Sequence, residues 1–272
     1  MHIANITILG AGNMGASLLG GLIADQFPAD KIWIADPAED KLAVLQKNFL
    51  VHTDKDNKTA VKDAEIIILA VKPQIMATVV QEIAPIVQSK KPLVISIAAG
   101  VRVQTIQTWL GGNIPIVRVM PNTPALLGCG ASGLFANAFV NETQHDQAES
   151  ILRAVGITIW LQDENLMDAV TAVSGSGPAY FFLVMESLQH AAEALGLSKD
   201  VARLLTLQTA LGAARMALES NHSIAELRKQ VTSPGGTTEQ ALRILEEKNV
   251  REIFMQAVNA AAKRSKELAE SI

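Results

Sequence analysis

Two glycine-rich stretches of this 272-residue chain combine residue types and spacings that suit the binding of anions. The first, "ITILGAGNMGASLLGGL", contains Gly10-x-Gly12-x-x-Gly15 between a β-branched run and an apolar helical pattern. The second, "VTSPGGTTEQAL" at 231–242, places a proline and two glycines before another helical pattern. Glycines before a helix expose backbone amides, which attract negatively charged groups. Both stretches are therefore candidate binding sites.

The first stretch has the context that the dinucleotide-binding fingerprint requires, a strand before the glycines and a helix after them. In that fingerprint Gly10 permits a tight turn, Gly12 lets the backbone approach a pyrophosphate, and Gly15 allows close packing of helix on strand. The alternative is a structural glycine turn without a ligand. The surrounding pattern favours a dinucleotide.

The choice between NAD and NADP depends on Asp36, which lies about 20 residues beyond Gly15, at the end of the second expected strand. An acid there would bond a free ribose 2′-hydroxyl and repel a 2′-phosphate, which favours NAD. Alternatively, Asp36-Pro37 is a turn whose acid faces solvent. The next segment also offers possible partners for a phosphate, so the sequence leaves the preference open: Lys41, Lys55, Asn57 and Lys58.

The second stretch also has two interpretations. Thr237 is a candidate N-cap, and Gln240 would complete a capping box, in which case "PGG" is only a break between helices. Alternatively, the two glycines expose amides for an anionic ligand. The two are compatible if one threonine caps the helix while the other hydroxyl faces the ligand.

The elements that must position these stretches change type along the chain. Up to residue 162, short β-branched runs (3–9, 31–35, 65–71, 92–98, 114–120 and 156–161) alternate with helical patterns (14–25, 38–49, 74–88 and 142–156). This alternation predicts an α/β fold, a doubly wound parallel sheet of Rossmann type with helices on both faces. From 163 onward only Ala- and Leu-rich helical patterns follow, at 178–196, 199–220, 223–231, 237–248 and 250–271. We therefore expect a dinucleotide-binding domain at 1–162 and an all-α domain at 163–272.

The C-terminal helices carry apolar residues around much of their circumference, more than one core face requires. They form either a plain helical domain or one whose surplus apolar surface pairs with a second subunit. We expect the pairing.

Composition and charge exclude some classes of binding partner. The net charge is −4 and the pI about 5.8, which disfavours nucleic acid or an anionic membrane, and no apolar stretch is long enough to span a bilayer. The single cysteine, Cys129, excludes an internal disulfide and a cysteine-based metal cluster, and it fits the reducing cytoplasm. Its small, apolar neighbours predict a packed thiol. We expect no metal site.

Four segments, in this order, resemble those of the pyrroline-5-carboxylate reductases: "GAGNMGASLLGGL", "VRVMPNTPALLGCGASGLF", "AVSGSGPAYFF" and "VTSPGGTTEQALRILE". The resemblance covers essentially the whole chain, and "SPGGTT" is its most specific part. It implies reduction of the cyclic imine 1-pyrroline-5-carboxylate to L-proline, the last step of proline biosynthesis, by hydride from NAD(P)H. It also implies a preference for NADPH, which opposes the simplest interpretation of Asp36, and dimers through the C-terminal helices that often assemble into decamers.

The resemblance further implies residue roles. The dinucleotide would contact Leu9, Gly10, Ala11, Gly12, Asn13, Met14 and Gly15 at its pyrophosphate, Ala35 and Asn57 near the adenosine ribose, and Ala70, Val71, Lys72, Pro73, Ile97, Ala98 and Ala99 along its nicotinamide half. The substrate carboxylate would be held by Ser233, Gly235, Gly236, Thr237 and Thr238, with Thr238 as the catalytic residue nearest the ring nitrogen. The segment "MPNTP" at 120–124 either shapes the nicotinamide pocket or is only a proline-rich turn.

Two other functions share the N-terminal fingerprint. The β-hydroxyacid dehydrogenases carry a catalytic lysine on a helix after a glycine-rich turn, but the turn "SGSGPAYFF" here is followed by no lysine before Lys199. A catalytically silent NAD(P)-sensing module would bind the dinucleotide without turnover.

Overall fold

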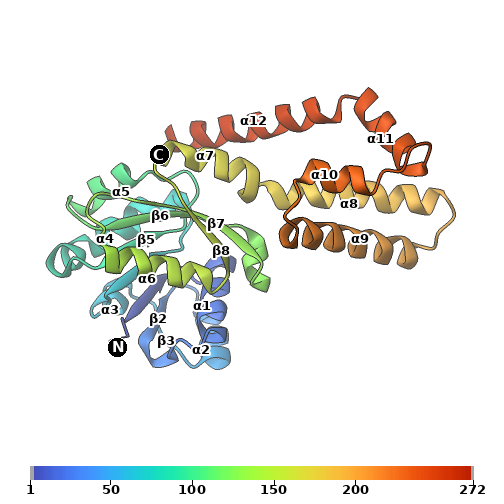
Figure 1. The fold of residues 1–272 in the computed structure, drawn as a ribbon. Coiled ribbons are helices and arrows are strands. Elements are labelled where there is room, and N and C mark those ends of the chain that lie inside the picture. Colours follow the sequence, from blue (N-terminus) through green and yellow to red (C-terminus); the bar gives the residue numbers. More distant parts are fainter. Residues whose placement is uncertain (1–2, 271–272) are drawn as a thin grey trace. The chain divides into compact units, whose positions relative to one another are not determined.

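A computed structural model describes residues 3–270 of the chain and contains an eight-stranded sheet (Figure 1). The strand order is β3-β2-β1-β4-β5-β6-β7-β8. Strands β1 to β6 run parallel, β7 is antiparallel to β6, and β8 is parallel to β7. The bounds are Ile6–Leu9 (β1), Ile32–Ala35 (β2), His52–Asp54 (β3), Ile66–Leu69 (β4), Leu93–Ser96 (β5), Ile116–Met120 (β6), Gly130–Ala136 (β7) and Gly156–Trp160 (β8).

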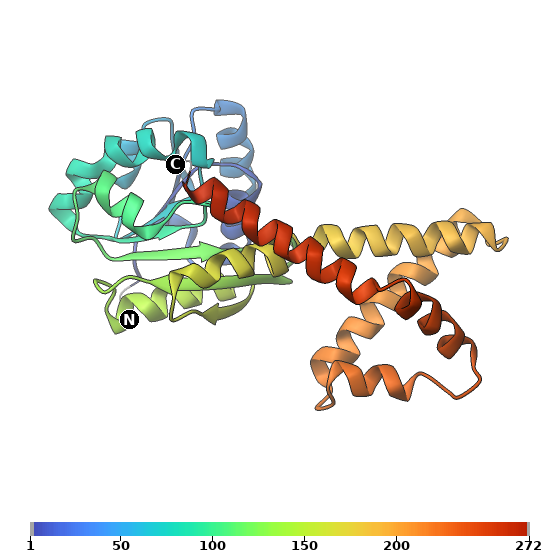
Figure 2. The ribbon, with the colours of Figure 1, turned by 90° about the horizontal axis from the view of Figure 1, so that it is seen from above.

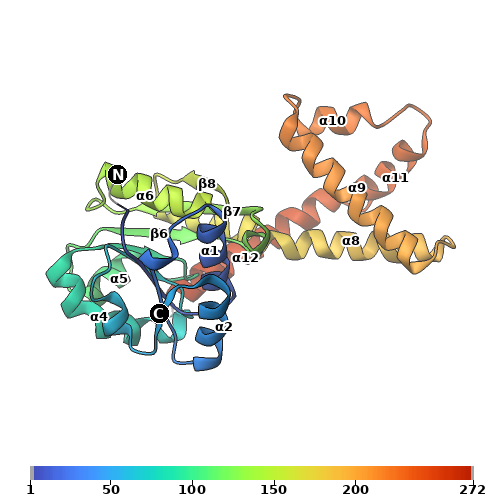
Figure 3. The same cartoon turned by 90° about the horizontal axis from the view of Figure 1, so that it is seen from below.

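Helices cover both faces of this sheet (Figures 1 and 3). One apolar core packs α1 (Asn13–Ala24), α2 (Glu39–Phe49) and α6 (Glu142–Arg153) on one face. A second core packs α3 (Asn57–Val61), α4 (Pro73–Lys90) and α5 (Val103–Leu110) on the other. Every residue of β1, β4 and β5 is buried, as expected for parallel strands covered on both sides. The predicted doubly wound sheet is confirmed.

The sequence pattern missed two strands, β3 and β7. Strand β3 is a three-residue edge strand without a buried residue, so it has no apolar signature. Strand β7 reads GASGLFA, and glycine is disfavoured in strands. Its glycines are needed for close packing: a Cβ on Gly133 would lie 2.9 Å from the Val170 side chain, and one on Gly130 would lie 2.8 Å from the carbonyl oxygen of Val155.

The chain forms two compact units. Residues up to Ser176 and those from Ala261 onward form the first, and Gly177–Ala260 forms the second. Helical structure begins near residue 163, as the sequence indicates, with turns of 3-10 helix at Glu164–Leu166, α7 at Met167–Val170 and a π-helical turn at Thr171–Gly175. This stretch nevertheless packs within the first unit, so the compact sheet unit extends 14 residues beyond the expected boundary, from 163 to Ser176.

The second unit is entirely helical. It contains α8 (Gly177–Ala194), α9 (Lys199–Glu219), α10 (Ile224–Gln230), α11 (Thr237–Glu247) and the first part of α12 (Val250–Glu270), which Figure 2 shows as one continuous helix. Helices α8 and α9 pack against each other (Figure 3). Large apolar side chains remain exposed in this single chain, for example Phe181 at 68% and Leu204 at 67%. None of the helices within residues 3–270 has the length and apolar composition that crossing a bilayer requires.

Candidate active site

The glycine-rich loop lies at the carboxyl ends of β1 and β4, the edge of a doubly wound sheet where ligands bind. Backbone hydrogen bonds join the loops that leave three neighbouring strands. The amide of Gly10 donates to the carbonyl of Ala35 at 2.8 Å, and that of Ala70 donates to Leu9 at 2.8 Å. The residues that the resemblance assigns to the dinucleotide at the carboxyl ends of β1, β2 and β4 therefore share this edge.

The three glycines have different surroundings. Gly10 has a φ of +109°, and a Cβ there would lie 2.6 Å from the carbonyl oxygen of Ala70. A Cβ on Gly15 would lie 2.2 Å from the carbonyl oxygen of Gly10. Around Gly12, by contrast, nothing lies within 4 Å of the added Cβ. Packing of the loop itself therefore requires Gly10 and Gly15, whereas Gly12 borders open space.

That open space lies at the start of helix α1. Gly12 is the N-cap of α1, no side chain caps the helix, and its first turn contains no acidic residue. The first amides of the helix, at the positive end of its dipole, therefore have no side-chain cap, and the protein carboxylate beside them, Asp36, accepts from the amide of Ala11. The arrangement has the properties of the dinucleotide fingerprint, which its spacing alone does not guarantee.

Asp36 is half-buried and bonded within the protein. Its Oδ2 accepts a hydrogen bond from the amide of Ala11 at 2.8 Å, and its Oδ1 accepts one from the amide of Ala38 at 2.9 Å. The acid therefore neither faces solvent as a simple turn residue nor has an oxygen without a protein partner.

The other residues that the sequence offers as partners for the ribose or its phosphate differ in exposure and in hydrogen bonding. Asn57 is half-buried and its Nδ2 donates to Glu82 Oε2 at 2.9 Å. Lys55 forms an ion pair with Glu39 on α2. Lys41 and Lys58 are exposed, whereas Ala35 is buried at the end of β2.

The nicotinamide candidates lie after the next two strands of the same edge. Lys72 is the N-cap of α4 and Pro73 begins that helix. Ile97 and Ala98, directly after β5, are buried, while Ala99 is exposed. The three residues are apolar and directly follow the carboxyl end of β5.

The segment "MPNTP" is held mainly by the side chain of Asn122, which is 9% exposed. Its Nδ2 donates to the carbonyl of Ser174 at 3.1 Å, and its Oδ1 accepts from the amide of Ala131 at 2.9 Å. Both polar atoms tie the turn to the rest of the first unit, which supports the structural interpretation of this segment.

The prediction of a packed thiol is wrong, because Cys129, beyond a turn at Gly128 with φ of +68°, is exposed.

The loop at 231–238 belongs to the second unit, and α11 begins at Thr237, as the sequence pattern indicates. The N-cap is Gly236, so the predicted capping box of Thr237 and Gln240 is wrong. The amide of Gly236 donates to the carbonyl of Ser233 at 3.0 Å, and this turn moves the cap onto the glycine. The amide of Gly235 donates to Glu239 Oε2 at 2.8 Å.

This loop still exposes donors. No side chain caps the amides at the start of α11, Thr237 and Ser233 are exposed, and Thr238 is half-buried. Gly235 has a φ of +73°, a conformation that favours glycine. The five residues assigned to the substrate therefore lie together in one turn. One amide of that turn, that of Gly235, is already hydrogen-bonded to the carboxylate of Glu239.

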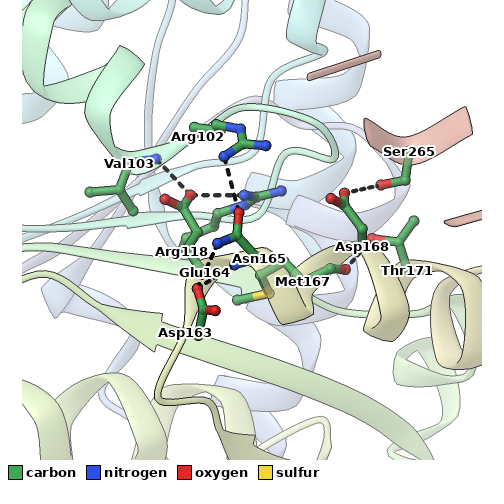
Figure 4. Close-up of polar contacts among 10 residues, drawn as sticks. All are labelled: Arg102, Val103, Arg118, Asp163, Glu164, Asn165, Met167, Asp168, Thr171 and Ser265. Atoms are coloured by element: carbon green, nitrogen blue, oxygen red, sulfur yellow. Dashed lines mark hydrogen bonds and ion pairs between the residues drawn. The ribbon is translucent and has the colours of Figure 1, made fainter. Parts of the chain in front are cut away.

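Sequence reasoning did not single out a buried polar cluster beside α5 (Figure 4). Arg118 Nη1 and the amide of Val103 both donate to Glu164 Oε1, each at 2.8 Å. Ser265 Oγ, on α12, donates to Asp168 Oδ1 at 2.7 Å. These contacts hold the start of the helical segment and the end of α12 within the first unit. The available signal was an arginine inside the apolar run "IPIVRVM".

Among residues 3–270, no three or more His, Cys, Asp or Glu side chains are grouped so that they could hold a metal ion.

Two family models and many known proteins match this chain. A family model described as pyrroline-5-carboxylate reductase dimerisation matches residues 164–268, and one described as NADP oxidoreductase, coenzyme F420-dependent, matches residues 5–100. The pyrroline-5-carboxylate reductase of Pseudomonas aeruginosa is 51% identical over 272 residues, covering 100% of this chain and 99% of that protein. The chain belongs to the pyrroline-5-carboxylate reductase family. The predicted family is thus confirmed.

Other members of the pyrroline-5-carboxylate reductase family are similar along the whole chain. The Vibrio alginolyticus enzyme is 42% identical over 98% of each chain. The Coxiella burnetii structure is 49% identical, with a TM-score of 0.95 over 98% of this chain and 99% of that one. The Plasmodium falciparum structure, which has NADP bound, is 33% identical, with a TM-score of 0.88 over 99% of each. They confirm the predicted fold class and the enzyme class, an oxidoreductase acting on a C=N bond.

Proposed function

We propose that the loop at Gly10–Gly15 holds a nicotinamide dinucleotide and that the loop at 231–238 holds 1-pyrroline-5-carboxylate, which is reduced to L-proline. The observation that carries the proposal is the open backbone at Gly12, on an uncapped helix start, in a chain that matches pyrroline-5-carboxylate reductases over its full length. NAD(P)H, when bound, supplies the hydride.

For the cofactor, the first amides of α1 would bind the pyrophosphate, Ala35 and Asn57 would border the adenosine ribose, and Ala70–Pro73 with Ile97–Ala99 would border the nicotinamide. We propose NADPH as the preferred cofactor, with NADH also accepted. The NADP in the Plasmodium falciparum relative supports this preference. Two exposed cations near the ribose side, Lys41 and Lys58, are available to a 2′-phosphate.

For the substrate, the exposed amides and hydroxyls of Ser233 and Gly235–Thr238 would bind the carboxylate. Thr238 would donate or relay a hydrogen bond to the ring nitrogen. A protonated imine is already a strong electrophile, so the protein needs little acid–base machinery and acts mainly by orienting the two rings. Holding reactants in a near-attack geometry contributes on the order of 7 to 11 kcal/mol in favourable cases.

We further propose that the active species is a homodimer formed through the helices of residues 164–268, with assembly of five dimers into a decamer, in the cytoplasm. The exposed apolar side chains of α8 and α9 support the dimer, because patches of this kind mark protein interfaces. If the partner subunit supplies the facing cofactor domain, dilution below the dimer dissociation constant abolishes turnover. A fully active monomer would contradict this.

The test is a steady-state assay with pyrroline-5-carboxylate and either NADPH or NADH. We expect turnover with both and a higher kcat/KM with NADPH. Tight NADPH binding without turnover would instead indicate an NAD(P)-sensing module. Oxidation of 3-hydroxy acids with NADP would indicate a β-hydroxyacid dehydrogenase.

A further inference from the structure

Asp36 links two loops that both border the proposed dinucleotide site. It follows β2 directly, and its carboxylate reaches the glycine-rich loop, 25 residues earlier in the sequence. One oxygen accepts from the amide of Ala11 at 2.8 Å, and the other accepts from the amide of Ala38 in its own turn at 2.9 Å. The neighbouring amide of Gly10 donates to the carbonyl of Ala35 at 2.8 Å. The end of β2 therefore holds two consecutive residues of the loop.

The loop has little freedom on its other side. The Cβ position of Gly10 is only 2.6 Å from the carbonyl oxygen of Ala70, and Ala70 donates to Leu9 at 2.8 Å. Ala11 is 7% exposed, so water cannot readily replace Asp36 as the acceptor for its amide. A buried amide that loses its acceptor is strongly disfavoured, so the loop would rearrange if the carboxylate were removed.

An acid at this place in a Rossmann fold ordinarily reads the ribose 2′-position. Here both carboxylate oxygens are oriented by backbone amides, and the two bonds compensate part of the charge that would repel a 2′-phosphate. These contacts suit a residue that shapes the loop. They also remove the conflict between an acid at the end of β2 and use of NADPH.

We propose that Asp36 is a positioning residue that holds the glycine-rich loop in its dinucleotide-binding conformation and does not discriminate NADPH from NADH. The inference rests on the proposed placement of the dinucleotide at Gly10–Gly15. Both cofactors carry the same pyrophosphate, and Ala11 lies between Gly10 and Gly12 in the loop proposed to bind it. Disturbing that loop therefore weakens the binding of both cofactors equally, while kcat of the enzyme with cofactor bound is little changed.

The test compares Asp36→Ala and Asp36→Asn with the unmodified enzyme, using calorimetric Kd values for NADPH and NADH and steady-state kinetics. For Asp36→Ala we expect both Kd values to rise about tenfold, with their ratio and the kcat at saturating cofactor unchanged within about twofold. Asp36→Asn retains one acceptor oxygen, so its effect is smaller and in the same direction. Asp40→Ala, an exposed acid in the first turn of α2, removes the same charge and leaves both Kd values unchanged.

Either of two results would overturn the inference. A shift of the Kd ratio toward NADPH by more than about fivefold would mean that Asp36 reads the ribose. Unchanged Kd values for both cofactors in both Asp36 variants would mean that the loop does not depend on it. If the unmodified enzyme bound neither cofactor, the proposed dinucleotide site itself would fail, which is distinguishable because that result involves no variant.

Discussion

Replacing Glu164 with alanine removes the acceptor shared by Arg118 and the first amide of α5. The Arg118 side chain is only 6% exposed and that of Glu164 18%, with Nη1 and Oε1 2.8 Å apart. Removing one member of a buried ion pair costs about 3–5 kcal/mol, because the remaining charge is left without a partner. The Val103 amide loses its acceptor too, a loss of about 1–3 kcal/mol that overlaps with the first and is reduced by water entering beside the alanine. We expect a net loss of about 4 kcal/mol of unfolding free energy.

The assay is thermal and urea unfolding at one fixed protein concentration, since subunit association changes the apparent stability. A loss of this size lowers the Tm by about 8–16 °C in a domain of this length. The double variant Arg118→Met, Glu164→Gln removes both charges and should recover most of the loss. Asp63→Ala breaks the exposed Lys90–Asp63 pair, with side chains 43% and 75% exposed, and should cost no more than about 1 kcal/mol. A Glu164→Ala protein within about 1 kcal/mol of the unmodified one would refute the assigned role of the cluster.

Three further predictions concern the loops and the surface. Thr238→Ala should lower kcat by an amount that corresponds to about 2–4 kcal/mol of barrier, and Thr238→Ser, which keeps the hydroxyl, should recover most of the lost kcat. A kcat of Thr238→Ala within about twofold of the unmodified enzyme would exclude a hydrogen bond from Thr238 to the ring nitrogen. Gly12→Ala should leave the Tm unchanged but weaken NADPH binding at least about tenfold, whereas Gly15→Ala should lower the Tm, because only the latter Cβ meets the backbone, at 2.2 Å. Hydrogen bonds from Trp160, and secondly from Arg153, hold the pKa of Glu149 below the ordinary 4.5. The contribution of the ionised Glu149 to folding stability is therefore present above that pH and is lost on acidification. Glu149→Gln should therefore have the lower Tm at pH 7, the difference vanishing as the pH falls; a difference independent of pH would exclude the charge as the cause.

Local patterns predicted most of the elements. Strands β1, β4 and β5 were visible because strands buried on both faces consist of continuous apolar residues. The helices of the second unit were visible through their apolar period and their turns. Strand β7 was not visible, because its glycines disguise it. They are required by the close approach of Val170 and Val155, which are distant in the sequence.

In the two loops too, the sequence predicted what depends on neighbouring residues and missed what depends on a specific contact. The glycine spacing predicts a turn at Gly10, since few other residues adopt its φ of +109°. Which residue caps α11 depended instead on the turn between Ser233 and Gly236, so the threonine pattern was misleading.

The sequence by itself determined the family, the alternation of strands and helices, and the two loops rich in exposed amides, because these depend on side-chain periodicity and on backbone sterics within a few residues. Only the tertiary structure decided that the carboxylate of Asp36 bonds Ala11, that Arg118 pairs with Glu164, and that Ser265 reaches Asp168. Each of these partners lies 25 to 97 residues away along the chain. Such contacts depend on the order of strands in the sheet and on which helix covers which face, and the whole core, rather than any one segment, specifies that order.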